Sequence, residues 1–337
     1  MNGVPSREQT TSCLSQVVRF RVHSFSKIFI STTCFQGYTK CEPGSRENLL
    51  IIGILGRVTR RHFHISRPVL WINTVGPATI GMWLSGDLWS WDFLPVLLWL
   101  TLPFNLLIYG INDVFDQETD AKNPRKGTLE GARIEPGEVR IIWLGVLLAN
   151  LPFLIYFVLS VPLLAVFWMI LYALLFAGYS VPPARFKARP YLDSLSNAAY
   201  AFPLVFTPLA LSASPVWPAA TGLMAWSVAK HTFDAVQDVD EDRRVGIETT
   251  AVRLGPEGVV LWSGAFWALA TVCFALVNVP VALVNAAIAG SLVYLLHRDP
   301  TPQKGHRLYK YSIIFPYVAG TVAGVQLVGA LSLGLYP

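Results

Sequence analysis

Charged residues are scarce in this sequence. They make up 14% of the 337 residues, against about a quarter of an average soluble domain, whereas 53% of the residues are hydrophobic. The mean hydropathy is +0.47. Soluble proteins rarely combine these values, so the composition excludes an ordinary soluble domain and predicts a chain that crosses a membrane several times. No nucleic-acid partner is expected.

Cysteine is scarce as well, with four residues and no CxxC pair in the whole chain. Three of the four lie in the N-terminal tail. The sequence therefore predicts neither a disulfide framework nor a structural zinc site. The four residues are Cys13, Cys34, Cys41 and Cys273.

Long apolar runs are abundant, and nine of them are candidates for membrane spans, because a helix needs about 20 apolar residues to cross a hydrocarbon core. Two longer stretches are divided near Pro162 and Pro280, since proline tends to break helices. Connections with Lys or Arg alternate with connections that have none, which predicts an inside N-terminus and an outside C-terminus. We expect an all-α, polytopic helical bundle. The runs are roughly 69–86, 93–111, 141–158, 163–180, 192–211, 216–233, 257–277, 280–297 and 311–331.

The N-terminal segment differs from the rest of the chain. Residues 1–40 carry five Lys or Arg against one Glu, with many Ser and Thr. This composition is typical of a mitochondrial presequence and equally of a disordered cytosolic tail. We expect residues 1–56 to be an N-terminal extension, and residues 57–337 to form the transmembrane domain.

Acidic residues are rare overall but gather in two segments on the predicted inner side. Segments 112–140 and 234–248 hold 13 of the 21 Asp and Glu residues. In each cluster three aspartates are spaced to share one helix face. Such crowded carboxylates repel one another unless a cation bridges them, and Mg²⁺ is held by few carboxylates together with substrate phosphates. We therefore predict a Mg²⁺–diphosphate site whose ligands are Asp113, Asp116, Asp120, Asp234, Asp238 and Asp242.

Basic residues beside these acids are candidates for holding the diphosphate. The connection 179–190 is basic and rich in proline, the stretch 123–127 follows the first cluster, and Lys230 lies one helical turn before Asp234. An alternative is that these cations only anchor the chain at the inner surface. The candidate residues are Arg125, Lys126, Arg185, Lys187 and Lys230.

Such a site could ionise an allylic diphosphate, because metal ions neutralise the departing group and a dry, aromatic cavity protects the resulting carbocation. Aromatic faces attract cations, so several aromatic residues are candidates for lining this cavity, although simple packing or lipid contact is the alternative. The candidates are Trp71, Trp83, Phe104, Phe202 and Trp226.

The two acidic motifs read Asn112-Asp113-x-x-Asp116-x-x-x-Asp120 and Asp234-x-x-x-Asp238. Over about residues 60–335 the chain resembles the UbiA superfamily of intramembrane prenyltransferases, which carries NDxxDxxxD and DxxxD on nine transmembrane helices. The resemblance implies Mg²⁺ as cofactor and the motif aspartates as catalytic residues. It also implies that Asn112 assists them, and that Lys187 and Arg125 or Lys126 contact the diphosphate.

Within the superfamily, three stretches look most like lycopene elongases and related carotenoid-lipid prenyltransferases. They surround Asn73, Asn112 and Tyr179, so Asn73 and Tyr179 join the candidate substrate-binding residues. Compact bacterial members lack the long basic extension. This departure indicates an endomembrane or mitochondrial inner membrane in a eukaryotic cell.

Three functions remain open at this level. The leading one is transfer of a prenyl group from a prenyl diphosphate to a hydrophobic acceptor, which could be an aromatic ring, a polyene or a lipid, within the membrane lipid. The second is a membrane terpene cyclase that uses the same acidic site. The third is a cation transporter. The position of the acidic residues argues against it, because they lie at the ends of spans, whereas transporter sites usually lie near the midplane.

Overall fold

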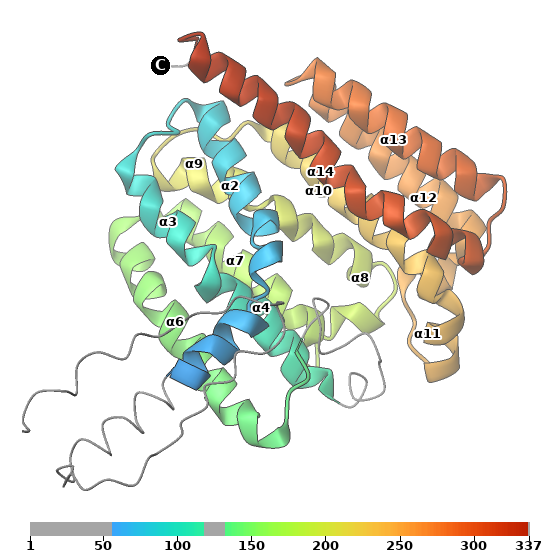
Figure 1. Ribbon diagram of the computed structural model, residues 1–337, viewed down its shortest axis with the longest axis horizontal. Helices are drawn as coiled ribbons and strands as arrows, with labels where there is room; N and C mark the ends of the chain where they lie inside the picture. The colour runs from blue at the N-terminus through green and yellow to red at the C-terminus, as the bar shows by residue number, and fades with distance from the viewer. Residues whose placement is uncertain (1–55, 118–131, 336–337) are drawn as a thin grey trace, which may run out of the picture. The chain divides into compact units, whose positions relative to one another are not determined.

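The computed structural model describes residues 56–117 and 132–335, and every regular element in these ranges is a helix (Figure 1). The predicted extension falls almost wholly outside the described residues, as do Asp120, Arg125 and Lys126. The α-helices are α2 (Ile72–Ser85), α3 (Leu94–Trp99), α4 (Leu102–Phe115), α6 (Val139–Ser160), α7 (Leu163–Ser180), α8 (Leu192–Leu195), α9 (Pro203–Ala210), α10 (Trp217–Asp234), α11 (Val239–Val245), α12 (Thr250–Ala275), α13 (Val279–His297) and α14 (Pro302–Ser332).

Proline and polar caps define where the later helices begin. α13 begins at a Val-Pro pair whose N-cap, Asn278, accepts a hydrogen bond from the Val281 amide at 3.1 Å. α14 begins at Pro302, and its N-cap Thr301 accepts from the Lys304 amide at 3.2 Å. Proline suits the first helical turn because its missing amide hydrogen has no intrahelical partner there. The predicted division near Pro280 is thereby confirmed.

The helices pack around two hydrophobic cores. The first joins α2, α3, α4, α6 and α7 around an aromatic group in which the Phe104 and Tyr172 rings stack with centroids 4.3 Å apart. The second joins α10, α12, α13 and α14 around Trp267 and Phe315. Helix α10 also packs against the 3₁₀ turn Ser196–Ala201, so it connects the two cores.

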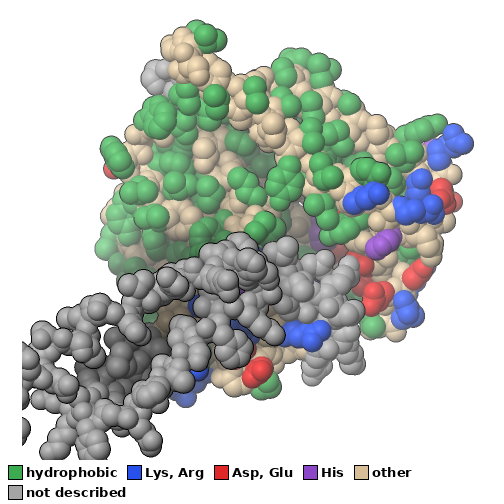
Figure 2. Space-filling view, viewed as in Figure 1, with side chains coloured by type: hydrophobic (Ala, Val, Ile, Leu, Met, Phe, Trp, Pro, Cys, Tyr) green, Lys and Arg blue, Asp and Glu red, His purple; other side chains and the backbone are tan. Residues whose placement is uncertain are grey.

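Apolar side chains cover most of the face seen in Figure 2, whereas charged side chains gather over α11 and the α13–α14 turn. Six helical segments of the described chain are long and apolar enough to cross a membrane. The chain is therefore an integral, multi-pass membrane protein, as predicted. The segments are Trp91–Phe115, Pro136–Ser160, Leu163–Ser180, Thr250–Ala275, Val279–His297 and Pro302–Ser332.

Each of the nine predicted runs coincides with helical structure, but the count of nine spans stays a prediction. Two runs are broken rather than continuous. The run 93–111 is divided between α3 and α4, where Thr101 is non-helical just before Pro103. The run 192–211 consists of α8, a 3₁₀ turn and α9, which begins at Pro203. Proline beyond the first turn removes a backbone donor and interrupts a helix, which explains both breaks.

The two acidic motifs do not lie on continuous α-helices, which corrects the expectation of one shared face for each. α4 ends at Phe115, so Asp116 is already its C-cap. α10 ends at Asp234, and a 3₁₀ turn, Ala235–Asp238, precedes α11. A 3₁₀ turn advances by about 120° per residue instead of about 100°, so it rotates Asp238 away from the predicted face. The turn buries Val236 and Val239 fully, three residues apart.

Candidate functional site

The first motif is tied down by a buried ion pair. Asp113 is fully buried, and its Oδ1 accepts a hydrogen bond from Arg67 Nη2 at 2.6 Å. The Arg67 guanidinium also lies over the Tyr109 ring, 4.4 Å from its centroid. Arg67 was not among the predicted site residues. Its position just before the first predicted span is the one feature of the sequence that could have indicated this contact. This aspartate therefore fixes the start of α2 against α4.

The second aspartate of this motif meets the basic connection after α7. Lys187 forms an ion pair with Asp116 Oδ1. Asn112 Nδ2 donates to Asp116 Oδ2 at 3.0 Å and to Ser180 Oγ at 2.9 Å. The structure thus brings together three of the predicted residues, Asn112, Asp116 and Lys187, from segments far apart in the sequence.

The second motif is organised differently. Lys230 pairs with Asp234 Oδ2 from the preceding turn of α10, and buried Ser312 of α14 donates to Asp234 Oδ1 at 2.5 Å. Further along, burial and the neighbouring Asp238 and Glu241 raise the pKa of Asp242 to about 6, against a weaker lowering by the Thr249 hydroxyl. Crowded carboxylates of this kind favour a nearby positive charge.

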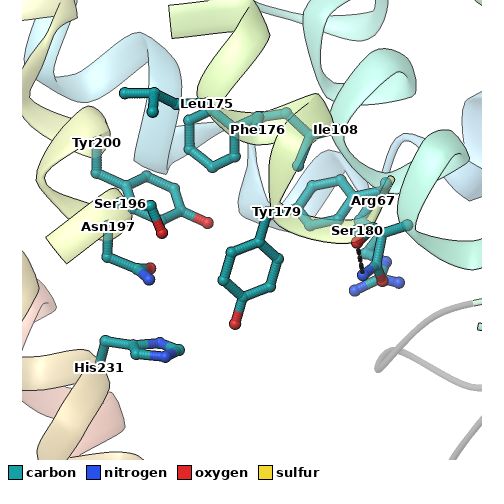
Figure 3. Close-up of a pocket in the computed structure, with 12 residues that line it drawn as sticks. Arg67, Ile108, Leu175, Phe176, Tyr179, Ser180, Ser196, Asn197, Tyr200 and His231 are labelled. Carbon is teal, nitrogen blue, oxygen red and sulfur yellow. Dashed lines mark hydrogen bonds between the residues drawn. The ribbon is translucent and has the colours of Figure 1, made fainter. Parts of the chain in front are cut away.

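A cavity of about 220 Å³ lies between the C-terminal ends of α4, α7 and α10 (Figure 3). Its wall is apolar at Ile108, Leu175 and Phe176, and polar at Asn197 and His231. Three tyrosines, Tyr109, Tyr179 and Tyr200, complete the aromatic part of the wall. Figure 3 shows the hydroxyls of Tyr179 and Tyr200 directed into the space.

Several predicted residues do not line this cavity. Asn73, in the first turn of α2, and Arg185, in the connection after α7, are exposed at the surface. The predicted aromatic lining is wrong for this cavity, because Phe104 and Phe202 pack in the first core instead. Trp71, Trp83 and Trp226 do not line it either. Sequence alone gave no means to tell which face of an apolar helix meets a cavity.

Sequence reasoning missed one residue of the cavity wall, His231, and the buried Asp193 beside it. Asp193 is fully buried on α8, and His231 lines the cavity from the last turn of α10. A signal was present for each. Asp193 is a lone acid in a run that was predicted to span the membrane, where an ionisable residue is a functional candidate. His231 lies three residues before Asp234, and so on the same side of the helix.

The donor set suits a hard divalent cation in chemical type, since it consists of carboxylate and amide oxygens. Within the described part of the chain, no three His, Cys, Asp or Glu side chains are already grouped as metal ligands. Three of the motif carboxylates are instead held by Arg67, Lys187 and Lys230. At Asp242, burial and then the neighbouring carboxylate of Asp238 raise the pKa, so a positive charge nearby would be favourable there.

Residues 74–315 match the UbiA prenyltransferase family. The chain belongs to this family. It is therefore a membrane prenyltransferase, and the predicted family and enzyme class are confirmed. Prenyltransferases of this family transfer a prenyl group from a prenyl diphosphate, which confirms the leading function over transport.

Several related proteins are named for their activity on lycopene. The lycopene elongase/hydratase of Corynebacterium glutamicum is 30% identical over 78% of this chain and 94% of its own length. The protein of the same name from Halobacterium salinarum is 36% identical over 67% of this chain and 82% of its own. A 4-hydroxybenzoate octaprenyltransferase of Paraburkholderia xenovorans is 28% identical over 58% of this chain and 68% of its own.

Solved structures share the fold of this chain at low sequence identity. A UbiA homolog from Archaeoglobus fulgidus, bound to DMAPP and Mg²⁺, has a TM-score of 0.60 at 19% identity, over 78% of this chain and 99% of its own. A UbiA homolog from Aeropyrum pernix K1 has a TM-score of 0.55 at 17% identity, over 77% of this chain and 98% of its own. The predicted UbiA-like all-α membrane fold is confirmed.

Proposed function

We propose that the chain transfers a prenyl group to a polyene within the membrane, and that the acidic motifs hold Mg²⁺ against the diphosphate of the donor. The observation that supports this most is the placement of Asp116 with Lys187, and of Asp234 with Lys230, at the inner ends of helices that enclose one cavity. A prenyl chain in the cavity would carry its diphosphate to this acidic and basic edge.

The proposed metal ligands are the six predicted aspartates, of which Asp120 lies outside the described residues. Bound Mg²⁺ would supply charge neutralisation for a departing diphosphate. Homologous structures contain Mg²⁺ or Cd²⁺, and some also hold DMAPP or GPP, which supports a divalent cofactor and a prenyl diphosphate donor. Asn112 orients Asp116 through the hydrogen bond that its amide donates.

The basic residues would hold the diphosphate oxygens. Lys187 is well placed because its ammonium already reaches Asp116 across the cavity edge, and Lys230 reaches Asp234. A phosphate oxygen could take the place of either carboxylate as partner of the ammonium. Arg125 and Lys126 stay candidates from the sequence, and the exposed side chains of Asn73 and Arg185 are weaker ones.

The cavity wall suits the reaction that follows. When the C–O bond of the donor breaks, its electron pair leaves with the diphosphate and an allylic cation remains. The rings of Tyr109, Tyr179 and Tyr200 stabilise a cation through their faces, and the apolar wall excludes water. A double bond of the acceptor then supplies the electrons of the new carbon–carbon bond.

A polyene acceptor is supported by the relatives. The proteins named lycopene elongase/hydratase reach 36% identity, whereas the two named 4-hydroxybenzoate octaprenyltransferase are 26% and 28% identical. We also propose residues 57–337 as the catalytic domain and residues 1–56 as an extension. An endomembrane or mitochondrial location of that domain stays a prediction.

The test is an incubation of the purified full chain with Mg²⁺ and prenyl diphosphates of five to twenty carbons. Each donor is offered with lycopene, with 4-hydroxybenzoate or with no acceptor, and diphosphate release and products are measured. Release that requires lycopene and yields a longer polyene supports the proposal. Release that occurs only with 4-hydroxybenzoate would show that the acceptor is aromatic and not a polyene. A cyclic hydrocarbon formed without any acceptor would establish a cyclase.

A further inference from the structure

A histidine lies on the polar side of the cavity, one turn from the acidic edge. His231 lines the cavity, and its ring meets the Tyr179 ring edge-on, with centroids 6.1 Å apart (Figure 3). It lies three residues before Asp234, so it faces the cavity one helical turn deeper than that carboxylate. A group bound by its diphosphate at the acidic edge would therefore extend past the imidazole.

A buried carboxylate orients this imidazole from behind. Oδ2 of Asp193 lies 3.7 Å from His231 Nε2, and the Asp193 side chain is fully buried. The carboxylate is itself fixed, because it accepts hydrogen bonds from the Thr250 amide at 3.0 and 3.1 Å and from the Thr250 hydroxyl. This separation is longer than a hydrogen bond, so the carboxylate acts on the ring through its charge, which favours a proton on the facing nitrogen, Nε2. Nδ1 is then the nitrogen with a free electron pair.

The proposed prenyl transfer leaves a proton to be removed. When the allylic cation joins a double bond of the acceptor, a new carbocation forms on the acceptor, and it becomes stable only by losing a proton or by gaining water. The other polar groups on the wall are a guanidinium, phenols, hydroxyls and amides, which are all weaker bases than an imidazole. The imidazole of His231 is the strongest base on this wall.

We propose that His231 is the catalytic base that ends the reaction, with Asp193 as its positioning residue; this rests on the function proposed above. A C–H bond next to the carbocation breaks, its electron pair forms a carbon–carbon double bond, and the proton goes to Nδ1 of His231. The buried Asp193 stabilises the imidazolium through Nε2 until the proton leaves with the products. The product is an elongated alkene.

A purely structural role is the alternative for both residues. Asp193 accepts from the first amide of α12, where a carboxylate stabilises a helix N-terminus, and His231 lies in the last turn of α10, where a cation does so. If the two residues were purely structural, substituting either one would change only folding or the overall rate. The ratio of products separates the readings, because only a base that touches the carbocation decides between proton loss and capture of water.

The test compares His231→Gln with the wild-type chain, using Mg²⁺, the donor and acceptor that give turnover, and product analysis. We expect the ratio of alkene to alcohol to fall at least about tenfold, while diphosphate release falls less, since ionisation precedes this step. Asp193→Asn should change the ratio in the same direction. His297→Gln is the matched control, because His297 occupies the last turn of α13, is exposed and lies away from the cavity.

An unchanged ratio in a folded His231→Gln protein would overturn the proposal and assign the proton to water or to the departing diphosphate. A wild-type product that is alcohol alone would overturn it too. If Asp193→Asn fails to fold, the His231→Gln result still decides the base. Absence of diphosphate release by the wild type with every donor is a different failure, because it removes the proposed transfer itself.

Discussion

The two acidic motifs have similar sequences but are neutralised in different ways. In the first, the cations come from distant segments, since Arg67 and Lys187 are 46 and 71 residues away from their partners Asp113 and Asp116. In the second, Lys230 pairs within its own helix, four residues before Asp234. The first motif therefore joins separate parts of the fold, whereas the second is largely self-contained.

Burial singles out Asp113 among the paired aspartates, since Asp116 is 16% exposed. The Asp113 side chain is fully buried, whereas the Asp234 side chain keeps 20% of its exposure. Beyond Asp234, burial first and the neighbouring carboxylates of Asp238 and Glu241 second raise the pKa of Asp242. The comparison indicates that the buried ion pair of Asp113 contributes to the stability of the fold, and the variants below test which motif residues serve the chemistry.

The largest effect should come from removing one proposed ligand from either motif. Asp116→Ala and Asp238→Ala should each lower diphosphate release at least about 100-fold, because a metal ion stabilises the departing charge by several kcal/mol. Both proteins should stay inserted and folded. Asp240→Ala is the control within the same cluster, since Asp240 is exposed on α11. Rates close to wild type in either variant would remove the metal site.

The second effect, on stability, should separate the motifs. Asp113→Asn leaves Arg67 without its buried partner, and breaking such a pair costs about 3–5 kcal/mol. Its Tm in detergent should fall clearly, whereas Asp238→Asn should leave the Tm near that of the wild type. Adding Arg67→Gln to Asp113→Asn should restore part of the loss, because no uncompensated charge remains. Equal Tm values for the two single variants would contradict the difference in roles.

A third effect should distinguish the two lysines. Lys187→Ala should raise the KM for the donor about tenfold, since a charged hydrogen bond contributes about 1.5–3 kcal/mol. Lys230→Ala should raise it less, because Lys230 is held by its own helix beside Asp234. The readout is steady-state diphosphate release over a range of donor concentrations. An unchanged KM with a low kcat for Lys187→Ala would instead place this lysine in departure of the diphosphate.

Much of the fold was accessible from the sequence because hydrophobic length and charge alternation act locally. The divisions near Pro162 and Pro280 follow from proline alone, and the helices end on either side of both. The 3₁₀ turn after Asp234 was not accessible. It depends on burying Val236 against α14, where Gly305 leaves room for the valine side chain. Such a contact joins residues far apart in the sequence.

Only those residues of the candidate site whose type indicates their chemistry could be predicted from the sequence. The structure pairs Asp116 with Lys187, whereas the expected contact of Lys187 with the diphosphate stays a prediction. His231 and Asp193 were missed, because Asp193 stands alone in an apolar run and the sequence does not show that it lies beside His231. Their proximity arises only when α8 packs against α10 and α12. Which aspartates hold metal stays a prediction for the variants above.

The smallest effect concerns pH and the second motif alone. Burial and the nearby Asp238 and Glu241 raise the pKa of Asp242 from 3.8 to about 6. The charged carboxylate therefore destabilises the folded, metal-free protein above about pH 6, and this cost shrinks as the pH falls toward 3.8. Without Mg²⁺, Asp242→Asn should thus raise the Tm slightly at about pH 7.5 and roughly half as much at about pH 5.

Saturating Mg²⁺ should reverse that order at the higher pH. The wild type keeps the carboxylate that binds the cation, and a ligand that binds only the folded state stabilises it. Thermal unfolding of the two proteins at both pH values, with and without Mg²⁺, provides the four comparisons. If Mg²⁺ raised the Tm of both proteins equally, Asp242 would not be a metal ligand. The ligands of the second motif would then be Asp234 and Asp238 alone. The same measurement on Asp113→Asn, where a buried cation already supplies the charge, shows whether this response belongs to the second motif only.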